Sequence, residues 1–285
     1  MISTIDQVTR ACQRWRYKQQ SWRIDGQGDR FNPAEYEVLP IADDTTARGY
    51  VLEHHYSGSY PSALHRFGLY RGGRLVGVAV YSTPTSNAVL TCVLPELVPS
   101  TESMELGRFV LEDAVPANAE SWMLARCHEY LLAAGVAGVV SFSDPVPRRL
   151  PSGALVMPGH IGTIYQATNA VYTGRAWPRS LWVMPDGTIF NGKALQKIRK
   201  QERGHEYAER ALVGFGARPM QDGENPYEWL RQAKAACRVV TFRHPGVHRY
   251  VFALGRNARA RAQVFIKAAQ HPYPKTIESR ELVAA

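Results

Sequence analysis

Two runs of β-forming residues flank the dipeptide Gly72-Gly73, and this feature strongly constrains the fold. The segment HRFGLYRGGRLVGVAVYSTP, residues 65–84, is rich in Val, Leu, Phe and Tyr on both sides of the glycines. Glycine adopts positive φ without steric cost, so two adjacent glycines suit a two-residue turn between antiparallel strands. The segment therefore predicts a β-hairpin within a larger sheet.

Strand and helix patterns alternate on both sides of this hairpin. Asp43 or Asp44 can cap the first helix, and Asn118 can cap a second helix that Gly135 ends. The alternation predicts a mixed α/β domain over residues 37–192. The other expected elements are a strand at 37–41, a helix through 47–52, a strand at 104–112, a helix at 121–135, a strand at 136–145, a helix at 159–174 and a hairpin at 179–190.

The composition changes on either side of this domain. Residues 1–36 form a basic arm with aromatic side chains, as in RWRYKQQSWR. Residues 193–285 are a basic extension with a helix-prone run at 193–212, a helix at 227–236 and a hairpin at 238–255. We expect a basic α+β C-terminal extension that packs on the main domain.

The charge of the chain favours an anionic partner. The 285 residues carry a net charge of +9, and the pI is about 9.5. Nucleic acid, a membrane surface or an acidic substrate would suit this charge. The alternative is a soluble protein that is basic but binds none of these partners. No apolar run is long enough to span a membrane, and no apolar secretory segment follows Met1. The four cysteines form no CxxC pair, which argues against a zinc knuckle or a disulfide framework and suits a reducing cytosol.

The segment GHIGTIYQATNAVYTG, residues 159–174, carries many hydrogen-bonding side chains. On a helical wheel, Ile164, Ala167 and Val171 form a narrow apolar face. A second face, a quarter-turn away, holds Tyr165, Thr168, Asn169 and Tyr172. Paired tyrosines beside an asparagine can stack on a flat polar ring and hydrogen-bond to it. The alternative is that the tyrosines only fasten a loop at the boundary of the core.

The strand before this segment ends in polar residues. Ser143 and Asp144 stand at its carboxyl end, in VVSFSDP. Ligands bind at the carboxyl ends of strands in α/β sheets, so Asp144 is a candidate general base or hydrogen-bond acceptor for a substrate amine. Asp144 could equally cap the turn that follows.

Four blocks of this sequence resemble the Mom family of phage DNA-modification proteins. They are EHHYSGSYP, ELGRFVLEDAVPANAES, SFSDP and GHIGTIYQATNAVYTG, in the order of the family, and the resemblance covers about residues 40–192. The resemblance implies a GNAT-like acyltransferase fold, with a mixed sheet flanked by helices. It also implies transfer of a carbamoylmethyl group to the N6 amine of adenine in phage DNA, which protects the DNA from host restriction enzymes.

The resemblance also assigns site residues. The positions that match those important in the family are His55, Tyr56, Arg108, Ser143, Asp144 and Tyr165. It implies catalytic roles for Asp144, Tyr165, Ser143 and Arg108. Tyr172, Asn169, Thr168 and Tyr56 are the predicted substrate-binding residues.

Iron has been suspected as a family requirement, which makes His54 and His55 candidate iron(II) ligands. Neighbouring residues of a helix point about 100° apart, so both histidines could not easily bind one ion there. On an extended segment one of them could, with carboxylate or histidine ligands from elsewhere. The alternative is that both histidines lie at a helix end or face DNA phosphate.

One departure from GNAT enzymes concerns the donor. Those that use acetyl-CoA cradle its pyrophosphate on a glycine-rich loop before a helix. The corresponding segment here, EDAVPANAES, has no glycine and contains Glu112, Asp113 and Glu120. We therefore do not expect ordinary use of acetyl-CoA, and the donor of the transferred group stays unknown.

A short basic run is the strongest candidate for contact with DNA phosphates. It contains Lys193, Lys197, Arg199, Lys200 and Arg203, with few acidic residues among them. The arm at 1–36 and the segment RNARARAQ are further candidates. A solvated basic face is the alternative for each.

Together these patterns predict a DNA base-modifying transferase that acts on adenine N6 in the host cell cytoplasm. Its partner would be double-stranded DNA and not a membrane, and its oligomeric state stays open, with a homodimer as the candidate. Two alternatives remain. One is an acyl-CoA-dependent N-acyltransferase acting on another amine, such as a hypermodified base. The other is a DNA-binding protein without catalytic activity.

Overall fold

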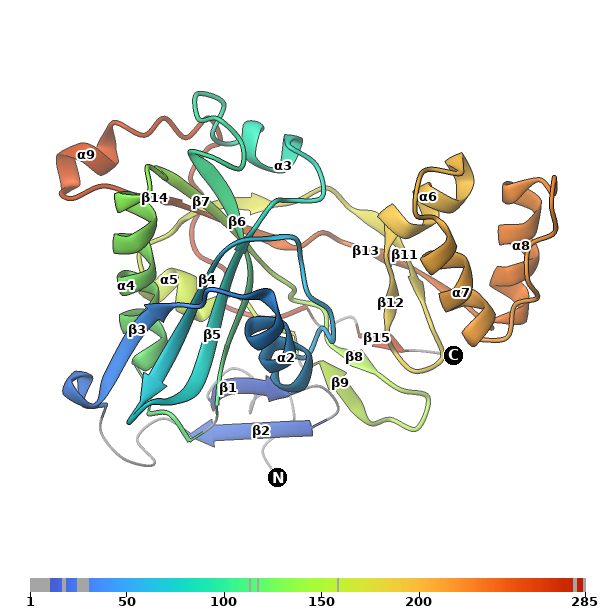
Figure 1. The fold of residues 1–285 in the computed structure, drawn as a ribbon, viewed down its shortest axis with the longest axis horizontal. Helices are drawn as coiled ribbons and strands as arrows, with labels where there is room; N and C mark the ends of the chain where they lie inside the picture. The colour runs from blue at the N-terminus through green and yellow to red at the C-terminus, as the bar shows by residue number, and fades with distance from the viewer. Residues whose placement is uncertain are drawn as a thin grey trace. The chain divides into compact units, whose positions relative to one another are not determined.

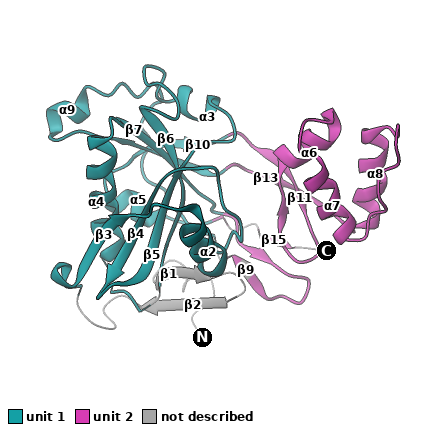
Figure 2. Cartoon of the chain, in the orientation of Figure 1, with its two compact units in different colours: residues 1–145, 159–176, 247–277 teal, residues 146–158, 177–246, 278–285 magenta. Residues whose placement is uncertain are grey.

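The computed structural model describes residues 31–112, 114–116, 118–157, 159–278 and 281–283, together with the backbone of 11–16 and 19–24. The chain divides into two compact units (Figure 2). The first contains residues 1–145, 159–176 and 247–277, and the second contains 146–158, 177–246 and 278–285. The chain thus leaves the first unit three times and returns to it twice.

A seven-stranded mixed sheet forms the centre of the first unit (Figure 1). All its neighbouring strands are antiparallel except the pair β6 and β7, which is parallel. The strand order across the sheet is β3 (Tyr36–Pro40), β4 (Ala63–Arg71), β5 (Arg74–Ser82), β6 (Ser103–Leu111), β7 (Gly138–Ser143), β14 (His248–Ala253) and β10 (Val171–Arg175). The predicted mixed sheet of an α/β domain is therefore confirmed.

The hairpin predicted around Gly72-Gly73 is present. Arg71 pairs with Arg74 across the turn, and the two glycines have φ values of 55° and 77°. Positive φ at both central residues is the geometry that adjacent glycines make accessible.

Helices cover both faces of the sheet. On one face, α4 (Ala119–Ala133) and α5 (Thr163–Ala167) pack in a core that includes Tyr81. On the other face, α2 (Asp44–His54) packs on Val78 and Val80. Successive strand residues point to opposite faces, so Val80 and Tyr81 serve two different cores. Three shorter helices complete the unit: η1 (Pro33–Glu35), α3 (Ala88–Thr91) and α9 (Ala258–Ala262).

The predicted helix caps are present in part. Asp43 is the N-cap of α2, where its carboxylate accepts a hydrogen bond of 2.8 Å from the Thr46 backbone N–H. Asn118 precedes α4 as predicted, but it has a φ of 74° and its side chain makes no capping hydrogen bond. There the Ser121 hydroxyl instead donates to the Asn118 carbonyl oxygen.

The second unit contains two three-stranded sheets and three helices. Its hydrophobic core packs around Trp229, Ile198 and Leu212. One sheet has the order β12 (Ile189–Phe190), β11 (Arg179–Val183) and β13 (Val240–His244), the other the order β15 (Leu282–Val283), β8 (Arg148–Arg149) and β9 (Leu155–Met157), and the helices are α6 (Gly192–Lys200), α7 (Glu206–Gly214) and α8 (Pro226–Ala236). The predicted hairpin at 179–190 is confirmed by the pairing of Trp182 with Phe190.

The predicted helix over residues 159–174 is wrong. Only Thr163–Ala167 are helical, and residues Val171–Arg175 form strand β10. Asn169, with a φ of 60°, reverses the chain, and the Ala170 N–H donates to the Tyr165 carbonyl oxygen. Asparagine tolerates this left-handed conformation, while the run Val-Tyr-Thr after it favours a strand. Tyr165 and Tyr172 therefore do not share a helix face.

The predicted hairpin at 238–255 is also wrong, because its two strands belong to different sheets. Strand β13 pairs with β11 in the second unit, whereas β14 pairs with β7 and β10 in the main sheet. The predicted division at residue 193 therefore differs from the structure. Most of the second unit is an insertion between strands β10 and β14, not a C-terminal extension.

Up to residue 24, the predicted N-terminal arm is described only as backbone, whereas residues 31–36 are described with their side chains. Residues Ala11–Arg16 (β1) and Gln19–Ile24 (β2) pair as antiparallel strands. The basic and aromatic side chains of RWRYKQQSWR lie outside the described residues.

Candidate active site

The parallel strands β6 and β7 pair along only part of their length. Their pairing joins Ser103 to Gly138, Met104 to Val139 and Glu105 to Val140, and it ends there. Beyond these pairs, Leu106–Leu111 hydrogen-bond only to β5 within the sheet, and Ser141–Ser143 only to β14. Backbone and side chains between the separated strand ends are thus available to a site.

A bulge positions Arg108 at the start of this separation. Val80 pairs with Arg108 and Tyr81 pairs with Leu106, so Gly107 is the extra residue of β6. A Cβ atom on Gly107 would lie 2.5 Å from the Ser82 hydroxyl oxygen, so any larger residue there would have to displace the Ser82 side chain. The Arg108 guanidinium donates to the Ser59 carbonyl oxygen at 2.9 Å and to the Ser59 hydroxyl at 2.7 Å. These bonds hold its charge beside the loop that follows α2.

The loop after α2 contributes two stacked rings. His55 is buried, and its ring stacks on that of Tyr56 with 4.4 Å between centroids. The His55 Nδ1 accepts a hydrogen bond of 3.1 Å from the Ser57 backbone N–H. Burial, followed by the charge of Arg108 and the ring of His160, lowers the pKa of His55 well below its ordinary value. His55 is therefore a neutral imidazole at pH 7.

Asp144 and His160 meet where the chain leaves and re-enters the first unit. The His160 backbone N–H donates to the Asp144 carbonyl oxygen at 2.7 Å. The His160 ring also lies edge-to-face against Tyr56, with 6.2 Å between centroids. Burial lowers the pKa of His160, and the charge of Asp144 opposes that shift. Residues at the end of β7, after α2 and before α5 therefore face one another.

Tyr165 completes this group from α5. Its ring lies 5.3 Å from that of Tyr250, and burial raises the pKa of its phenol to about 12. Its hydroxyl also interacts electrostatically with Tyr56, Glu105 and Arg108. The phenol is therefore protonated at neutral pH and can donate a hydrogen bond.

Gly162 permits these residues to pack closely. It has a φ of 70°, and a Cβ there would lie 2.8 Å from the rings of Tyr165 and Tyr250 and 3.0 Å from the Ser143 hydroxyl. The Tyr250 hydroxyl donates to the Ile161 carbonyl oxygen, and Gln166 Nε2 donates to the same carbonyl at 2.9 Å. These bonds fix the turn that carries His160.

The structure thus brings six of the predicted residues together. We call this group, with His160, the splay-site cluster, after the separated ends of β6 and β7. Its members are His55, Tyr56, Arg108, Ser143, Asp144, His160 and Tyr165. A half-buried cation, a carboxylate, two phenols and two neutral imidazoles can together bind an anionic group and exchange protons with an amine.

Three predicted substrate-binding residues have other contacts. The Tyr172 hydroxyl forms a hydrogen bond of 2.7 Å with His248 Nδ1, and the Thr168 hydroxyl donates to the Ile164 carbonyl oxygen at 2.7 Å. Asn169 is exposed at the chain reversal after α5. Their expected convergence depended on the long helix, and it is absent because that helix is short.

The two candidate iron ligands do not form a metal site. The His54 ring packs on Tyr50 of its own helix at 4.4 Å, whereas His55 stacks on Tyr56. Among the described residues, no three His, Cys, Asp or Glu side chains lie together in a way that could hold a metal ion. The side chains around His54 and His55 therefore do not fit iron(II).

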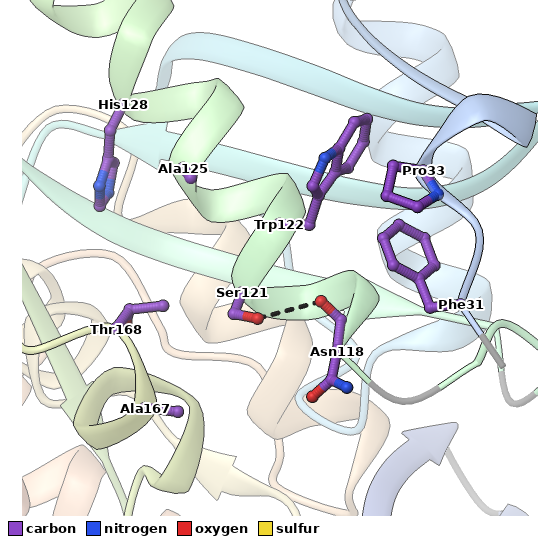
Figure 3. Close-up of a pocket in the computed structure, with 9 residues that line it drawn as sticks. All are labelled: Phe31, Pro33, Asn118, Ser121, Trp122, Ala125, His128, Ala167 and Thr168. Carbon is purple, nitrogen blue, oxygen red and sulfur yellow. Dashed lines mark hydrogen bonds between the residues drawn. The ribbon is translucent and has the colours of Figure 1, made fainter.

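A separate pocket of about 490 Å³ lies between α4, α5 and the segment before β3 (Figure 3). Phe31 and Trp122 form one wall, with their rings 5.6 Å apart in an edge-to-face arrangement. Burial lowers the pKa of His128, another lining residue, to about 4. Thr168 also lines this pocket and is the one predicted substrate-binding residue to do so. The pocket can accept an apolar or aromatic group.

The predicted DNA-contact residues lie on α6 and the turn after it, in the second unit. Arg199, Lys200 and Arg203 are exposed and form no ion pair with the described residues. Lys193 pairs with Glu202 at 3.4 Å, and the Lys197 ammonium lies 5.3 Å from the centre of the Tyr207 ring. Residues 177–246 contain twelve Lys and Arg and seven Asp and Glu, so the insertion is basic.

Sequence patterns alone missed His160 and Tyr250. His160 lies in the distinctive segment at 159–174, where the helical wheel drew attention to the residues after it. Tyr250 lies in β14, which the sequence assigned to a separate extension. A search for histidines flanked by glycines, as in GHIG, would have selected His160.

Solved structures with similar folds are distant. A tandem GNAT protein from the clavulanic acid biosynthesis pathway is 13% identical, with a TM-score of 0.39 over 78% of this chain and 100% of its own. FeeM, an N-acyl amino acid synthase from uncultured soil microbes, is 12% identical, with a TM-score of 0.32 over 54% and 84% of the two chains. The ribosomal-protein-S18-alanine N-acetyltransferase from Escherichia coli is 12% identical, with a TM-score of 0.32 over 54% and 88%. Such distant similarities carry no information about the substrate.

The sequence itself gives a closer relationship. No curated relative matches the chain. The model of the Mom protein family, however, matches residues 35–275. This range includes the splay-site cluster and the basic insertion, and it extends well beyond the blocks at 40–192. The chain therefore belongs to the Mom protein family.

Proposed function

We propose that this protein is a phage DNA-modification transferase that attaches a carbamoylmethyl-type group to the N6 amine of adenine in DNA. The observation that carries the proposal is the splay-site cluster, which gathers Asp144, Arg108 and Tyr165 from elements far apart in sequence. Membership in the Mom family, whose members modify phage DNA, supports the class of reaction. The protection of DNA from host restriction enzymes follows from such a modification.

The substrate base would have to leave the DNA stack. An adenine amine inside a duplex is paired and enclosed, so enzymes that act on bases flip the target nucleotide into a pocket. In this proposal the ring of Tyr56 and the phenol of Tyr165 contact the flipped base. Asp144 accepts a hydrogen bond from the N6 amine, and Arg108 holds an anionic part of the donor or a phosphate.

The basic insertion would bind the DNA itself. Arg199, Lys200 and Arg203 are exposed and available to phosphates, which supports sequence-independent affinity. Among the described residues, no helix has both the length and the apolar character that a membrane crossing requires. We place the reaction in the host cytoplasm, where phage DNA is present.

Two features of the structure bear on the donor of the transferred group. Glu112, in the segment that replaces the glycine-rich loop, pairs with Arg74 at 2.6 Å, while Asp113 lies outside the described residues. The pocket of about 490 Å³ favours a second candidate, an acyl-CoA-dependent N-acyltransferase that acts on another amine. Calorimetric titration of the purified protein with acetyl-CoA separates the two. Micromolar binding favours the second candidate, and no binding favours the first.

Mass spectrometry of deoxynucleosides tests the proposal directly. DNA would be prepared from cells that express the chain and from cells with an empty vector. We expect an N6-substituted deoxyadenosine only with the chain, and resistance of the same DNA to restriction enzymes with adenine in their sites. Unmodified DNA from cells that contain folded protein would contradict the proposal.

A further inference from the structure

His160 is a conspicuous group in the splay-site cluster that has no role in the function proposed above. The residue is half-buried, but its Nε2 is shielded from solvent and has no hydrogen-bond partner among the described residues. Buried polar atoms nearly always have a partner in native proteins, and an exception calls for a functional explanation. A ligand that meets this nitrogen would provide one.

The position of the His160 ring is closely determined. Its backbone N–H is bonded to the Asp144 carbonyl oxygen at 2.7 Å, and its ring contacts Tyr56. Gly159 and Gly162, with φ values of 73° and 70°, bend the chain on either side of it. The next carbonyl, of Ile161, accepts hydrogen bonds from Tyr250 and Gln166. The imidazole is therefore held in place before any substrate binds.

Asp144, Tyr56 and His55 are the ionisable groups that face His160. Among the described residues, Asp144 supplies a negative charge that acts on the ring, and His55 is neutral at pH 7. A carboxylate beside an imidazole orients the ring and stabilises the imidazolium that forms when the ring takes a proton. The pair resembles, in chemical terms, the base and orienting acid of other transfer enzymes.

We propose that His160 is the catalytic base of the transfer, and that the Asp144 carboxylate orients the imidazole instead of taking the proton itself. This inference rests on the proposed function. It replaces the role of general base, for which the sequence made Asp144 a candidate, with that of a positioning residue. It also adds a catalytic residue that the sequence patterns did not select.

The step balances with a donor of one chemical class, an electrophilic carbon that carries a leaving group. The N6 lone pair of adenine forms the new N–C bond, and the bond between that carbon and its leaving group breaks. The leaving group departs with the bonding electron pair. The surplus proton of N6 passes to His160 Nε2, and the imidazolium then returns it to the leaving group or to water.

A histidine suits this task better than a carboxylate. General-base catalysis is most efficient when the pKa of the base lies near the working pH. Burial lowers the pKa of His160 and the charge of Asp144 opposes that shift, so the ring is neutral at pH 7 and can accept a proton. The nearby carboxylate then stabilises the charged product of that step.

The test measures the initial rate of DNA modification per folded protein in cells, after induction of the full chain. The variants are His160→Gln, His160→Asn, Asp144→Asn and the double variant Asp144→Asn/His160→Gln. His65→Gln is the matched control, because His65 is a half-buried histidine of β4 whose ring stacks on Phe67, outside the cluster. Melting temperature and duplex affinity are recorded for each.

We expect His160→Gln and His160→Asn to lose about 10²–10⁴ in rate with unchanged DNA affinity. His65→Gln should keep the wild-type rate. Residues that act as one unit give strongly non-additive losses, so the double variant should be no slower than the slower single variant. Wild-type rates in either folded His160 variant would overturn the inference, as would a double variant whose loss is the product of the single losses. If wild-type protein leaves DNA unmodified, the proposed function itself fails.

Discussion

The two units differ in where they keep their polar side chains. Of the buried polar and charged residues in the described chain, all except His244 belong to the first unit. The second unit has an apolar core around Trp229 and carries its charges on the surface of α6. Burying polar groups costs stability unless they are bonded, so a site of chemistry explains their concentration in the first unit. The difference indicates that the first unit carries out the chemistry and that the second unit provides affinity for DNA.

The largest effect should come from removing a hydroxyl of the splay-site cluster. Tyr165→Phe keeps the ring and its contact with Tyr250 but removes the group that interacts with Arg108. We expect a loss of about 10²–10⁴ in modification rate, with a melting temperature near that of the parent. Quantitative mass spectrometry of deoxynucleosides measures the rate.

Tyr172→Phe is the matched control for this substitution. Its hydroxyl is bonded to His248, so its loss should cost only about 1 kcal/mol of stability and little activity. Equal losses of activity in the two variants would mean that Tyr172 binds substrate, as the sequence predicted. Tyr172 would then belong to the splay-site cluster.

The next effect concerns the second unit. Replacing Arg199, Lys200 and Arg203 with Gln removes three exposed charges of the insertion. Each lost phosphate contact reduces the salt slope of binding by about 0.9, so the slope should fall by about 3. Affinity for all duplexes at physiological salt should fall by on the order of tenfold to a hundredfold. Fluorescence anisotropy over a range of salt concentrations gives both values.

Arg231→Gln provides the control for charge alone, since Arg231 is bonded to Glu228 in α8. Its salt slope should stay close to that of the parent. An unchanged slope in the triple variant would show that the α6 face does not contact DNA. The assignment of DNA affinity to the second unit would then be wrong.

A smaller effect should come from the close packing at Gly162. Gly162→Ala combines a φ of 70° with Cβ contacts of 2.8 Å to two tyrosine rings. We expect a loss on the order of 3 kcal/mol in the free energy of unfolding, together with reduced activity. Gly135→Ala has a similar φ of 88° and open space around it, so it should cost only about 1 kcal/mol. Equal losses in denaturant titrations would show that backbone strain alone acts at Gly162.

The last effect is a pH dependence of stability that arises from His128. Burial lowers its pKa in the folded protein to about 4, below the ordinary value of 6.5. Between these values the unfolded chain binds more protons than the folded one, so stability rises with pH across this window and falls as the pH drops towards 4. The contribution is at most about 1.4 kcal/mol per pH unit.

His128→Gln should remove this part of the slope. Urea titrations between pH 4 and pH 7 would compare the variant with the parent. The same slope in both proteins would show that other groups, such as the buried His55, dominate the acid response.

Local patterns in the sequence predicted much of the first unit. The hairpin at Gly72-Gly73, the Asp43 cap and strands β6 and β7 depend on residues near one another in the chain, and such signals can be read directly. The return of β14 to the main sheet could not be read in this way. Its pairing with β7 joins residues about a hundred positions apart, and no local periodicity encodes that choice of partner.

The site was predicted in the same uneven way. Family blocks selected Arg108, Asp144 and Tyr165, which the structure brings together. The helical wheel added Thr168, Asn169 and Tyr172, and it failed because Asn169 reverses the chain and the next residues form a strand. His160 could be identified as a site residue only from the fold. Its place beside Asp144 depends on a fifteen-residue segment that leaves the end of β7 and returns to it.

The central claim is that the first unit modifies DNA that the second unit helps to bind. One comparison tests it most directly: N6-substituted deoxyadenosine and duplex affinity, both measured for the full chain and for Asp144→Asn. We expect modified DNA with the full chain, a loss of about 10²–10⁴ in rate with Asp144→Asn, and equal duplex affinities. Modification at the parental rate in Asp144→Asn, or DNA that stays unmodified with the full chain, would contradict it.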